Sequence, residues 1–547
     1  MAPASQSAPA DSGNRRRALR AHLMNSLTRG AQVSQNSIPE LETADPLHRP
    51  PLPADLIAEV LRSVPAADVA RPGLRIDGLE IVGALNVSYI DFAQELEFTN
   101  CEFTDSIDLT QARVAGIRLY KSTLTSLNDE YAVNAPDLEV RGSVVLPEQV
   151  NRPINLAGAK IHGNLAGCPR LVSELGDSWV LDALGIEVGG VISVGLPDHL
   201  WGGAINLFGA EVVGGVRIAG TIEQPVDGFA LDLSWASIGE ELDLNLRVQG
   251  VESPADVVLR TKSASVKRDL TIRMALADGS VDATDTVVEG RFAVAQQGRL
   301  PQGALLISGL AASDVDVGAR AADLPKPREL TRWKVEDISG HLRAHAKSAR
   351  DWLDGAGTFT AQPWEELAKI YKANGQPADA RRMQYWAARR ATRHSPPGTR
   401  LARNLYWATT GHGYYPLLAL VWLVGLFASA YVLTTLNHDR FTTPTTVAIS
   451  RATESSSPAN KSEQSQSEGE PTSGRSTAED CKNPQWDTPC LNDGEYAISL
   501  TLSPVTGSLP WQPPHGWVSG LLLLIRALSW VFVALLLAGV TGLLRAD

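Results

Sequence analysis

The stretch that decides the fold is FTNCEFTDSIDLTQARVAGIRLYKSTL, residues 98–124. Its large apolar residues recur at steps of five or six positions: Phe98, Phe103, Leu109, Val114, Leu119 and Leu124. A helix repeats every 3.6 residues and a strand every two, so neither explains this spacing. In a square β-solenoid each side takes about five residues and directs one bulky side chain inward. The spacing therefore predicts a solenoid coil.

Two further observations support this interpretation. A small residue stands two positions before several of the bulky ones, as Cys101, Ala112 and Ser122 do, and we expect it to pack inside beside them. A phrase also recurs along the chain: LRIDGLEIVGAL at 74, INLAGAKIHGNL at 154, INLFGAEVVGGV at 205 and LDLSWASIGEEL at 231. From the second copy onward the copies lie about 22 to 28 residues apart, an interval typical of solenoid coils. The stretch resembles a pentapeptide-repeat coil.

The predicted fold class is mainly β, a right-handed β-solenoid (pentapeptide-like) over residues 73–327, followed by a helical hairpin and two transmembrane helices. A two-sheet sandwich is the alternative, but it would show turn signals at regular spacing rather than a recurring phrase. A filled solenoid has long flat faces and no cleft, so it usually binds another macromolecule or acts as a spacer.

The composition fits a folded protein and argues against a general nucleic-acid binder. The 547 residues are 44% hydrophobic and 20% charged, with a net charge of −12. Arginine is much commoner than lysine and alanine is abundant, which suggests a GC-rich bacterial source. The polar N-terminus has no apolar core after its arginines, so we expect no secretory signal peptide.

The segments outside the repeats have different patterns of apolar and polar residues. We expect a disordered N-terminus at 1–50, a short helical cap at 51–72, a helical region at 328–395 and an Arg-rich neck at 396–415. Within the helical region, one hairpin is close to the tetratricopeptide pattern, through Trp364, Leu367, Ala368, Tyr371, Gly375, Ala380 and Ala387. A single copy predicts a hairpin that caps the solenoid or packs on the neck, with peptide binding as the alternative.

Two segments, 416–436 and 518–544, are long and apolar enough to cross a bilayer as helices, with two buried core helices as the alternative. Residues 381–410 contain seven arginines and no acidic residue, whereas 437–515 contains ten acidic and five basic residues. The positive-inside rule then predicts a multi-pass protein of the cell membrane with both termini cytoplasmic. The loop at 437–515 is expected to be extracytoplasmic and partly disordered.

Three residues in or near these spans are candidate sites. Cys481 and Cys490 lie close together in the outer loop, where a disulfide is permitted, so we predict that they pair; the alternative is two free thiols. Arg526 lies about eight residues inside the second span. It could snorkel to the interface or precede the true span, or it could be a functional intramembrane charge. Cys101 and Cys168 are expected to be inert buried thiols.

No catalytic, cofactor-binding or metal-ligating set stands out. His341 and His345 have the i, i+4 spacing of a helical metal site, but the glutamate of HExxH is missing, so a solvated helix face is expected instead. The glycine pairs of GIEVGGVISVG and AEVVGGVRIAG open no helix, which excludes a dinucleotide turn. There is no P-loop, GxSxG or CxxC sequence. We therefore expect no cofactor.

Taken together, the repeated phrase, the single hairpin, the Arg-rich neck and the two spans resemble a family of bacterial membrane proteins catalogued as membrane-associated oxidoreductases. The resemblance runs from about Leu74 to Leu544 and implies the architecture; no redox motif accompanies it. We expect a membrane-anchored scaffold that binds the lipid bilayer and an unknown protein partner. The alternatives are an oxidoreductase, as the family label implies, and a channel or transporter subunit that homo-oligomerises through its spans, with residues 496–511 as a pore loop.

Overall fold

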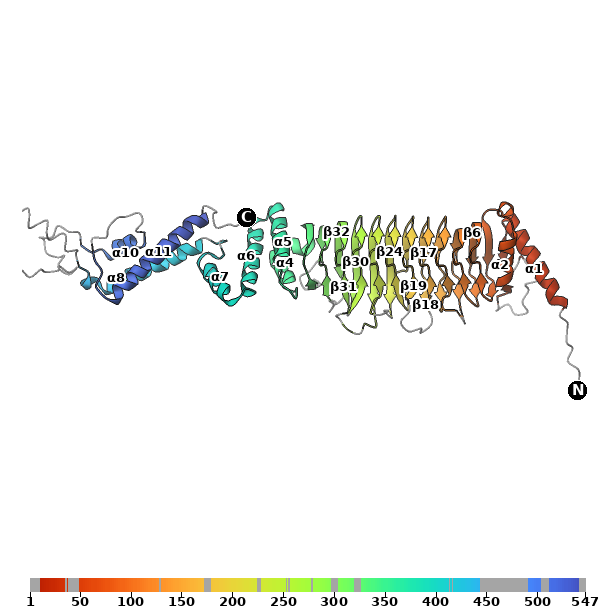
Figure 1. Ribbon diagram of the computed structural model, residues 1–547, viewed down its shortest axis with the longest axis horizontal. Coiled ribbons are helices and arrows are strands. Elements are labelled where there is room, and N and C mark those ends of the chain that lie inside the picture. Colours follow the sequence, from red (N-terminus) through yellow and green to blue (C-terminus); the bar gives the residue numbers. More distant parts are fainter. Residues whose placement is uncertain are drawn as a thin grey trace, which may run out of the picture. The chain divides into compact units, whose positions relative to one another are not determined.

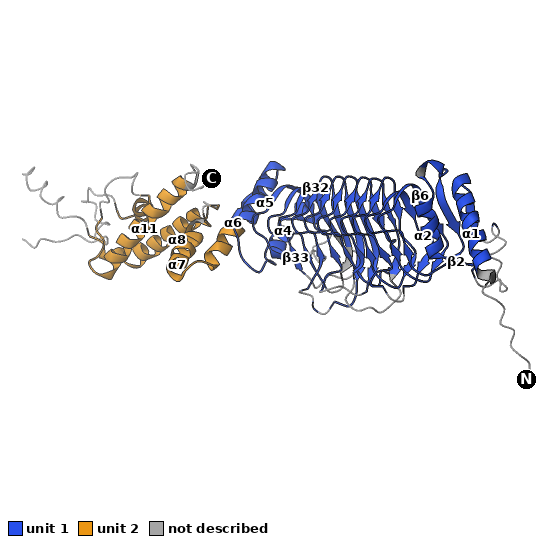
Figure 2. Ribbon diagram, turned by 45° about the vertical axis from the view of Figure 1, so that its right-hand side comes forward, with its two compact units in different colours: residues 1–384 blue, residues 385–547 orange. Residues whose placement is uncertain are grey.

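The computed structural model describes residues 10–34, 37, 49–126, 129–171, 179–223, 228–251, 253, 256–276, 279–296, 304–318, 326–412, 414–415, 417–442, 490–502 and 511–540. Two compact units divide the chain (Figure 2): Met1–Gln384 and Tyr385–Asp547. Most of the loop expected to be disordered, 443–489 and 503–510, lies outside the described residues.

The first unit is a parallel β-solenoid, which confirms the predicted fold class. Its coils follow one another in chain order (Figure 1), and every pair of neighbouring strands is parallel, with each strand bonded to the equivalent strand of the next coil. The strands form three sheets of 6, 11 and 19 strands. The 19-stranded sheet bends around a corner, because β9 pairs with both β12 and β13.

The strands of each sheet have the following bounds. The six-stranded sheet contains β2 (Pro51–Pro53), β4 (Glu80–Val82), β7 (Glu102–Phe103), β10 (Thr123–Leu124), β14 (Gln149–Val150) and β18 (Arg170–Leu171). The eleven-stranded sheet contains β5 (Leu85–Asn86), β8 (Ile107–Asp108), β11 (Val133–Asn134), β15 (Ile154–Asn155), β19 (Trp179–Asp182), β22 (Ala204–Asn206), β25 (Leu231–Asp232), β28 (Val257–Arg260), β31 (Ser280–Asp282), β33 (Ala304–Leu306) and β35 (Lys326–Glu329). The 19-stranded sheet contains β1 (Gln32–Ser34), β3 (Gly73–Asp77), β6 (Asp91–Thr99), β9 (Arg113–Arg118), β12 (Glu139–Val140), β13 (Val144–Val145), β16 (Lys160–Ile161), β17 (Leu165–Gly167), β20 (Glu187–Val188), β21 (Ile192–Val194), β23 (Glu211–Val212), β24 (Val216–Ile222), β26 (Ser237–Ile238), β27 (Leu242–Val248), β29 (Ser265–Val266), β30 (Leu270–Leu276), β32 (Val287–Gln296), β34 (Ala311–Asp316) and β36 (Lys334–Ile338).

The inward-facing residues are those that the five-residue spacing predicts. All of the six bulky residues between Phe98 and Leu124 are buried, and none is more than 3% exposed. The small residues Cys101, Ala112 and Ser122 are fully buried beside them. Each coil therefore fills its interior with one large side chain per side, and burial of such side chains is the main stabilising term.

A corner of constant geometry follows every strand of the eleven-stranded sheet. The last strand residue is often Asn or Asp, and its side-chain oxygen accepts a hydrogen bond from the amide two residues later, as Asn206 does from Phe208 (3.1 Å) and Asp232 from Ser234 (2.8 Å). This is an Asx turn. The side chains also bond between coils, and Asn206 Nδ2 donates to Asp182 Oδ1 at 2.8 Å. We call this turn the Asx corner.

The third residue after each of these strands has a left-handed backbone. Its φ lies between 53° and 73° in every coil: Tyr89, Gln111, Asp137, Gly158, Gly185, Gly209, Trp235, Ser263, Asp285, Gly309 and Arg332. Glycine takes this conformation freely, whereas other residues pay about 1–2 kcal/mol. The corner is thus set by the backbone, and residues of many kinds occupy it.

The N-terminal end of the solenoid corrects the expectation of disorder at 1–50 for residues 10–34, whereas 1–9, 35–36 and 38–48 lie outside the described residues. Helix α1 (Ala10–Arg29) precedes β1, which pairs with β3 and so extends the large sheet. Leu23 and Leu27 of α1 and Val33 of β1 are fully buried. Helix α1 packs on α2 (Ala54–Ser63), which lies within the predicted cap. The sequence did not predict this helix because α1 begins with polar residues and arginines, and its apolar residues form only a single stripe.

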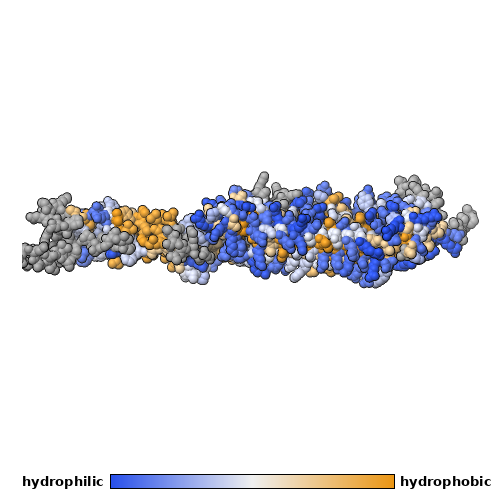
Figure 3. Space-filling model, turned by 90° about the horizontal axis from the view of Figure 1, so that it is seen from above, coloured by the Kyte–Doolittle hydropathy of each residue, from blue (hydrophilic) through white to orange (hydrophobic). Residues whose placement is uncertain are grey.

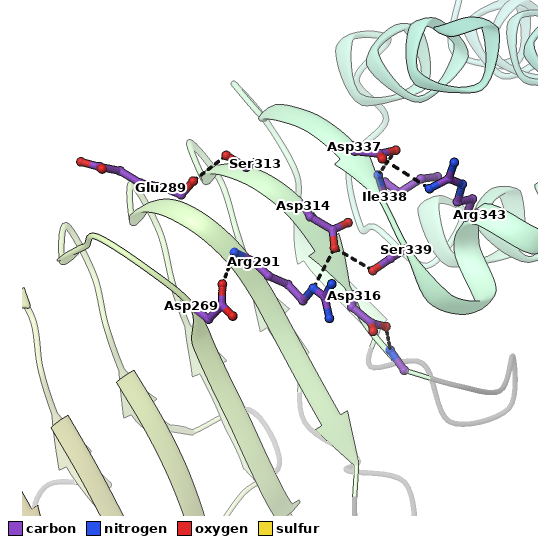
Figure 4. Close-up of polar contacts among 11 residues, drawn as sticks. Asp269, Glu289, Arg291, Ser313, Asp314, Asp316, Asp337, Ile338, Ser339 and Arg343 are labelled. Carbon is purple, nitrogen blue, oxygen red and sulfur yellow. Dashed lines mark hydrogen bonds and ion pairs between the residues drawn. The ribbon is translucent and has the colours of Figure 1, made fainter. Parts of the chain in front are cut away.

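The C-terminal end of the solenoid also lies later than predicted. The last coil strand, β36, ends at Ile338 rather than near 327, and helices α3 (Gly340–Ala344) and α4 (Ala346–Leu353) follow it. Figure 4 shows the polar network at this end. Asp314 accepts hydrogen bonds from Arg291 Nε (2.8 Å) and from Ser339 Oγ (2.9 Å). The network joins successive coils to the residue that begins the cap.

The predicted helical hairpin is present and covers the end of the solenoid. Helix α5 (Gln362–Ala373) packs on β36, and Gln362 exchanges hydrogen bonds with the backbone of Trp333. Its Trp364, Leu367 and Tyr371 are buried. Helix α6 (Pro377–Arg393) follows. These contacts favour the capping role over peptide binding, since the apolar face of α5 is already occupied.

The second unit is helical. The predicted neck contains helix α7 (Pro397–Thr410), and the two apolar segments are helices α8 (Leu417–Leu436) and α11 (Trp517–Val540). Between them lie the short turn η5 (His438–Arg440) and helix α10 (Asp493–Thr501). Helices α8 and α11 pack together, and Trp422 stacks on Phe532 with ring centroids 5.9 Å apart.

Candidate interaction surfaces

Trp235 is the most conspicuous outward-facing side chain of the solenoid. It occupies the left-handed position of the Asx corner, with φ of 62°, and is 64% exposed. In the three preceding coils the same position is Gly158, Gly185 and Gly209. A tryptophan here carries both the conformational cost of the left-handed region and the cost of an exposed aromatic ring.

Two more apolar side chains precede Trp235 on the same corner. Leu184 and Phe208 stand one residue before the left-handed glycines of their coils and are exposed. Backbone hydrogen bonds connect the three coils, because Gly185 N donates to Phe208 O and Gly209 N to Ser234 O, both at 2.8 Å. Leu184, Phe208 and Trp235 thus place exposed apolar side chains at the Asx corners of three consecutive coils, and we call them the apolar row.

A ladder of charged side chains runs beside this row. Its members begin successive strands of the 19-stranded sheet, and the register places them directly opposite one another: Arg113, Glu139, Lys160, Glu187 and Glu211. Arg113 pairs with Glu139 at 3.0 Å and Lys160 with Glu187 at 2.7 Å. The alternation ends at Glu211, which has no ion pair among the described residues. Glu187 and Glu211 are thus like charges in direct register, an arrangement that costs stability.

The apolar row and the end of the ladder form one surface. We call Leu184, Phe208, Trp235, Glu187, Glu211 and the exposed Val213 the corner patch. It combines apolar side chains with the negative charge of Glu211, which makes no ion pair among the described residues, beside that of Glu187, which is paired with Lys160. Neither the recurring phrase nor the five-residue spacing singled it out. Aligning INLAGAKI, INLFGAEV and LDLSWASI on their Asx residue would have done so, because a tryptophan then falls below two glycines.

The second unit exposes a large apolar surface. Helices α8 and α11 are long and apolar enough to cross a membrane, with mean hydropathies of 2.2 and 2.5. Their outward side chains include Leu420, Val424 and Leu523, and the space-filling view shows an apolar band over this part of the chain (Figure 3). Only 17% and 22% of the two segments is buried, so the described residues leave most of this apolar surface uncovered.

A small folded element closes one end of the α8–α11 pair. Phe441 packs edge-to-face on Tyr496 of α10 at 5.1 Å, and Thr442 pairs with Gln512 as an antiparallel bridge. His438 Nδ1 lies 2.8 Å from Asp493 Oδ1. The first part of the predicted pore loop is therefore helical, and its Tyr496, Ala497 and Leu500 are buried in a shared apolar cluster.

Arg526 is exposed on α11, close to this closed end of the helix pair. Burial raises the pKa of the Tyr496 phenol to about 12, and the positive charge of Arg526 opposes that shift, which shows that the two lie near each other. Arg526 is thus within electrostatic range of a residue of α10, which lies outside the two apolar helices. This location is consistent with a charge that reaches the interface. Its predicted functional role stays a prediction.

The cysteines divide into two groups. Cys490 is disulfide-bonded, while Cys481 lies outside the described residues, so their pairing stays a prediction. Cys101 and Cys168 are free thiols. Burial raises the pKa of the Cys101 thiol to about 11, and burial also raises the pKa of Cys168. Cys101 is fully buried, as expected for an inert thiol, whereas Cys168 is only half-buried.

The histidine pair does not occupy one helix. His341 lies in α3, and His345 stands at the break between α3 and α4. Their rings meet edge-to-face at 4.8 Å, and His341 Nε2 lies 2.9 Å from Ser348 Oγ. The described part of the chain contains no group of three His, Cys, Asp or Glu side chains placed to hold a metal ion.

No protein-family model, curated protein or solved structure matches this chain.

Proposed function

We propose that this protein is a membrane-anchored scaffold whose solenoid docks a partner protein through the corner patch. The observation that carries the proposal is Trp235, an exposed aromatic residue in a left-handed conformation. Residues kept at a cost to the fold concentrate at functional sites. Tryptophan is also the residue type most enriched among the side chains that dominate binding energy at protein interfaces.

The chemistry of the corner patch indicates the kind of partner. Its apolar row suits apolar side chains of the partner, and the negative charge of Glu211, in register with the ion-paired Glu187, suits a lysine or arginine among them. A basic residue placed beside Glu211 would continue the alternation of the charge ladder and relieve the repulsion from Glu187. The partner is therefore a protein segment that combines apolar and basic side chains.

Helices α8 and α11 supply the anchor. A 20-residue helix is about 30 Å long, which matches the hydrocarbon core of a bilayer. The arginines between 381 and 410 favour a cytoplasmic location for the solenoid and for both termini, with the loop that holds Cys490 outside. Reporter fusions test this topology: a phosphatase fused within 443–489 should be active, and an inactive one would contradict the orientation.

The docking surface is tested by photo-crosslinking in cells. A photoreactive amino acid at position 235 should give a specific crosslinked product. The same residue at position 89 should not, because Tyr89 has the same corner conformation and is 72% exposed but lies outside the corner patch. Once identified, the purified partner should lose binding to Trp235→Gly and Glu211→Lys and retain binding to Tyr89→Gly. Equal crosslinking at both positions would contradict a specific docking site.

A further inference from the structure

Helix α7 has two faces of opposite character. One face is fixed to α6: Trp407 Nε1 donates to Tyr385 Oη at 2.8 Å, Arg389 lies over the Trp407 ring at 5.6 Å, and Arg403 donates to Ser395 Oγ at 2.7 Å. At 100° per residue, Leu401 and Leu405 project from the opposite side of the helix. They are 75% and 68% exposed. No described residue covers this apolar side.

The position of α7 within its unit indicates what covers it. Helix α7 packs on both α8 and α11, and Trp422 Nε1 of α8 donates to Ala408 O of α7 at 2.8 Å. The α10 element packs around Ala430 of α8 and Val518 of α11, at the other end of the pair. Helix α7 therefore adjoins the apolar band of α8 and α11 at the end where α8 begins, and its bare face continues that band.

The charge around α7 is of one sign. Residues 385–410 contain five arginines and no acidic residue. Arg400 is exposed on α7 and makes no ion pair among the described residues, and Arg403 bonds only uncharged oxygens of α6 and the turn that follows. Such a helix, with leucines on one side and arginines on the other, has the pattern of a helix that lies in the plane of a membrane interface.

We propose that α7 is an interfacial membrane helix, with Leu401 and Leu405 in the acyl boundary and Arg400 at anionic lipid phosphates. The occupant of the bare face is thus the bilayer that α8 and α11 cross. The inference rests on the proposed anchoring by these helices and adds a second, charge-sensitive contact with the same membrane. An arginine near an anionic surface strengthens such a contact about five-fold.

The full-length protein, reconstituted in vesicles, allows a direct test. An environment-sensitive fluorophore is attached to Leu405→Cys, to Asn404→Cys and to Val424→Cys of α8, with the signal of the equally treated parent chain subtracted. Quencher-labelled phosphatidylcholine should quench the labels at 405 and 424 and leave the label at 404 largely unquenched. Asn404 is exposed and adjacent in sequence but lies 100° around α7 from Leu405, toward Arg400. Equal, weak quenching at 404 and 405 would overturn the proposal.

The same labels separate this proposal from membrane anchoring. If the label at 424 also escapes quenching, the anchoring itself is wrong. If 424 is quenched and 405 is not, only the interfacial role of α7 fails. Adding phosphatidylglycerol to the vesicles should increase quenching at 405, and Arg400→Gln should reduce that increase about five-fold. Inorganic phosphate in solution should not reduce it. Quenching at 405 that is insensitive to lipid charge and to Arg400→Gln would overturn the role assigned to Arg400.

Discussion

Trp235 occupies, one coil further along the solenoid, the same corner position as Gly209. Their φ angles are 62° and 67°, and the amides of both donate to the backbone of the next coil. The two residues therefore differ in side chain and not in backbone. A tryptophan at this place costs conformational energy that its neighbouring coils avoid, so the solenoid offers an internal control for the effect of the side chain.

Exchanging the two residue types should shift stability in opposite directions. Gly209→Trp places a side chain in the left-handed region and should lower stability by about 1–2 kcal/mol. A Cβ at Gly209 would meet no atom within 4 Å, so the backbone strain is not joined by a clash of the Cβ itself. Trp235→Gly removes that strain and should not lower the thermal midpoint of the detergent-purified protein. A clear loss of stability on Trp235→Gly would mean that the ring supports the fold rather than a partner.

The inward and outward sets of the opening stretch predict a strong contrast between neighbours. Leu119 is 3% exposed, and Leu119→Asp would bury a charge without a partner, which should destabilise its coil by several kcal/mol. Lys121 is exposed and has a φ of 54°, a conformation that aspartate tolerates. Lys121→Asp should therefore change the thermal midpoint little. Similar losses for the two variants would show that the inward-facing set is wrong.

The two free thiols should differ in reactivity. The thiolate is the nucleophile, and burial raises the pKa of Cys101 to about 11, so little thiolate forms at pH 8 and the fully buried side chain is also inaccessible. Burial raises the pKa of Cys168 as well, but this residue is only half-buried. Iodoacetamide should modify Cys168 first, and faster as the pH rises toward its pKa. Peptide mass mapping that found Cys101 modified first in the native protein would contradict this order.

Much of the fold could be predicted because the coil length of a solenoid appears in the sequence as the spacing of its inward-facing apolar residues. The spacing of Phe98, Phe103 and Leu109 requires one inward side chain per side, and no regular helix or strand shares it. The two apolar helices could also be predicted, because an apolar run of about 20 residues is typical of a membrane helix. These features depend on side-chain periodicity alone.

The ends of the solenoid and the corner patch depend on contacts that periodicity does not encode. Helix α1 has one apolar stripe among many arginines, and only its packing on α2 and β1 distinguishes it from a solvated segment. The coil that contains Trp235 follows the repeat and differs from the three preceding coils in having tryptophan instead of glycine at this corner position. Only the structure shows that the backbone at this corner is left-handed. A tryptophan there costs conformational energy, and this cost is the reason to expect a function for its side chain.

The N-terminal cap gives a last prediction, about the smallest soluble fragment. A fragment that begins at residue 51 would retain every coil from β2 onward, yet it would leave the edge of β3 unpaired, because β1 pairs there with Gln32 opposite Arg75. It would also expose the face of α2 on which α1 packs. Unprotected strand edges associate with other chains, and solenoids need terminal caps for solubility. The fragment 10–395 should therefore be monomeric in size-exclusion chromatography, and 51–395 should aggregate or unfold at a lower temperature.

Point variants of 10–395 distinguish the apolar contacts of the cap from its ion pairs. Leu23 is fully buried, so Leu23→Asp should reproduce the effect of removing the cap. Arg20 pairs with Glu59 at 2.8 Å on the surface, and exposed ion pairs contribute about 0–1 kcal/mol, so Arg20→Ala should leave the thermal midpoint nearly unchanged. If 51–395 is as stable and as monomeric as 10–395, α1 is a dispensable appendage and the solenoid protects its own edge.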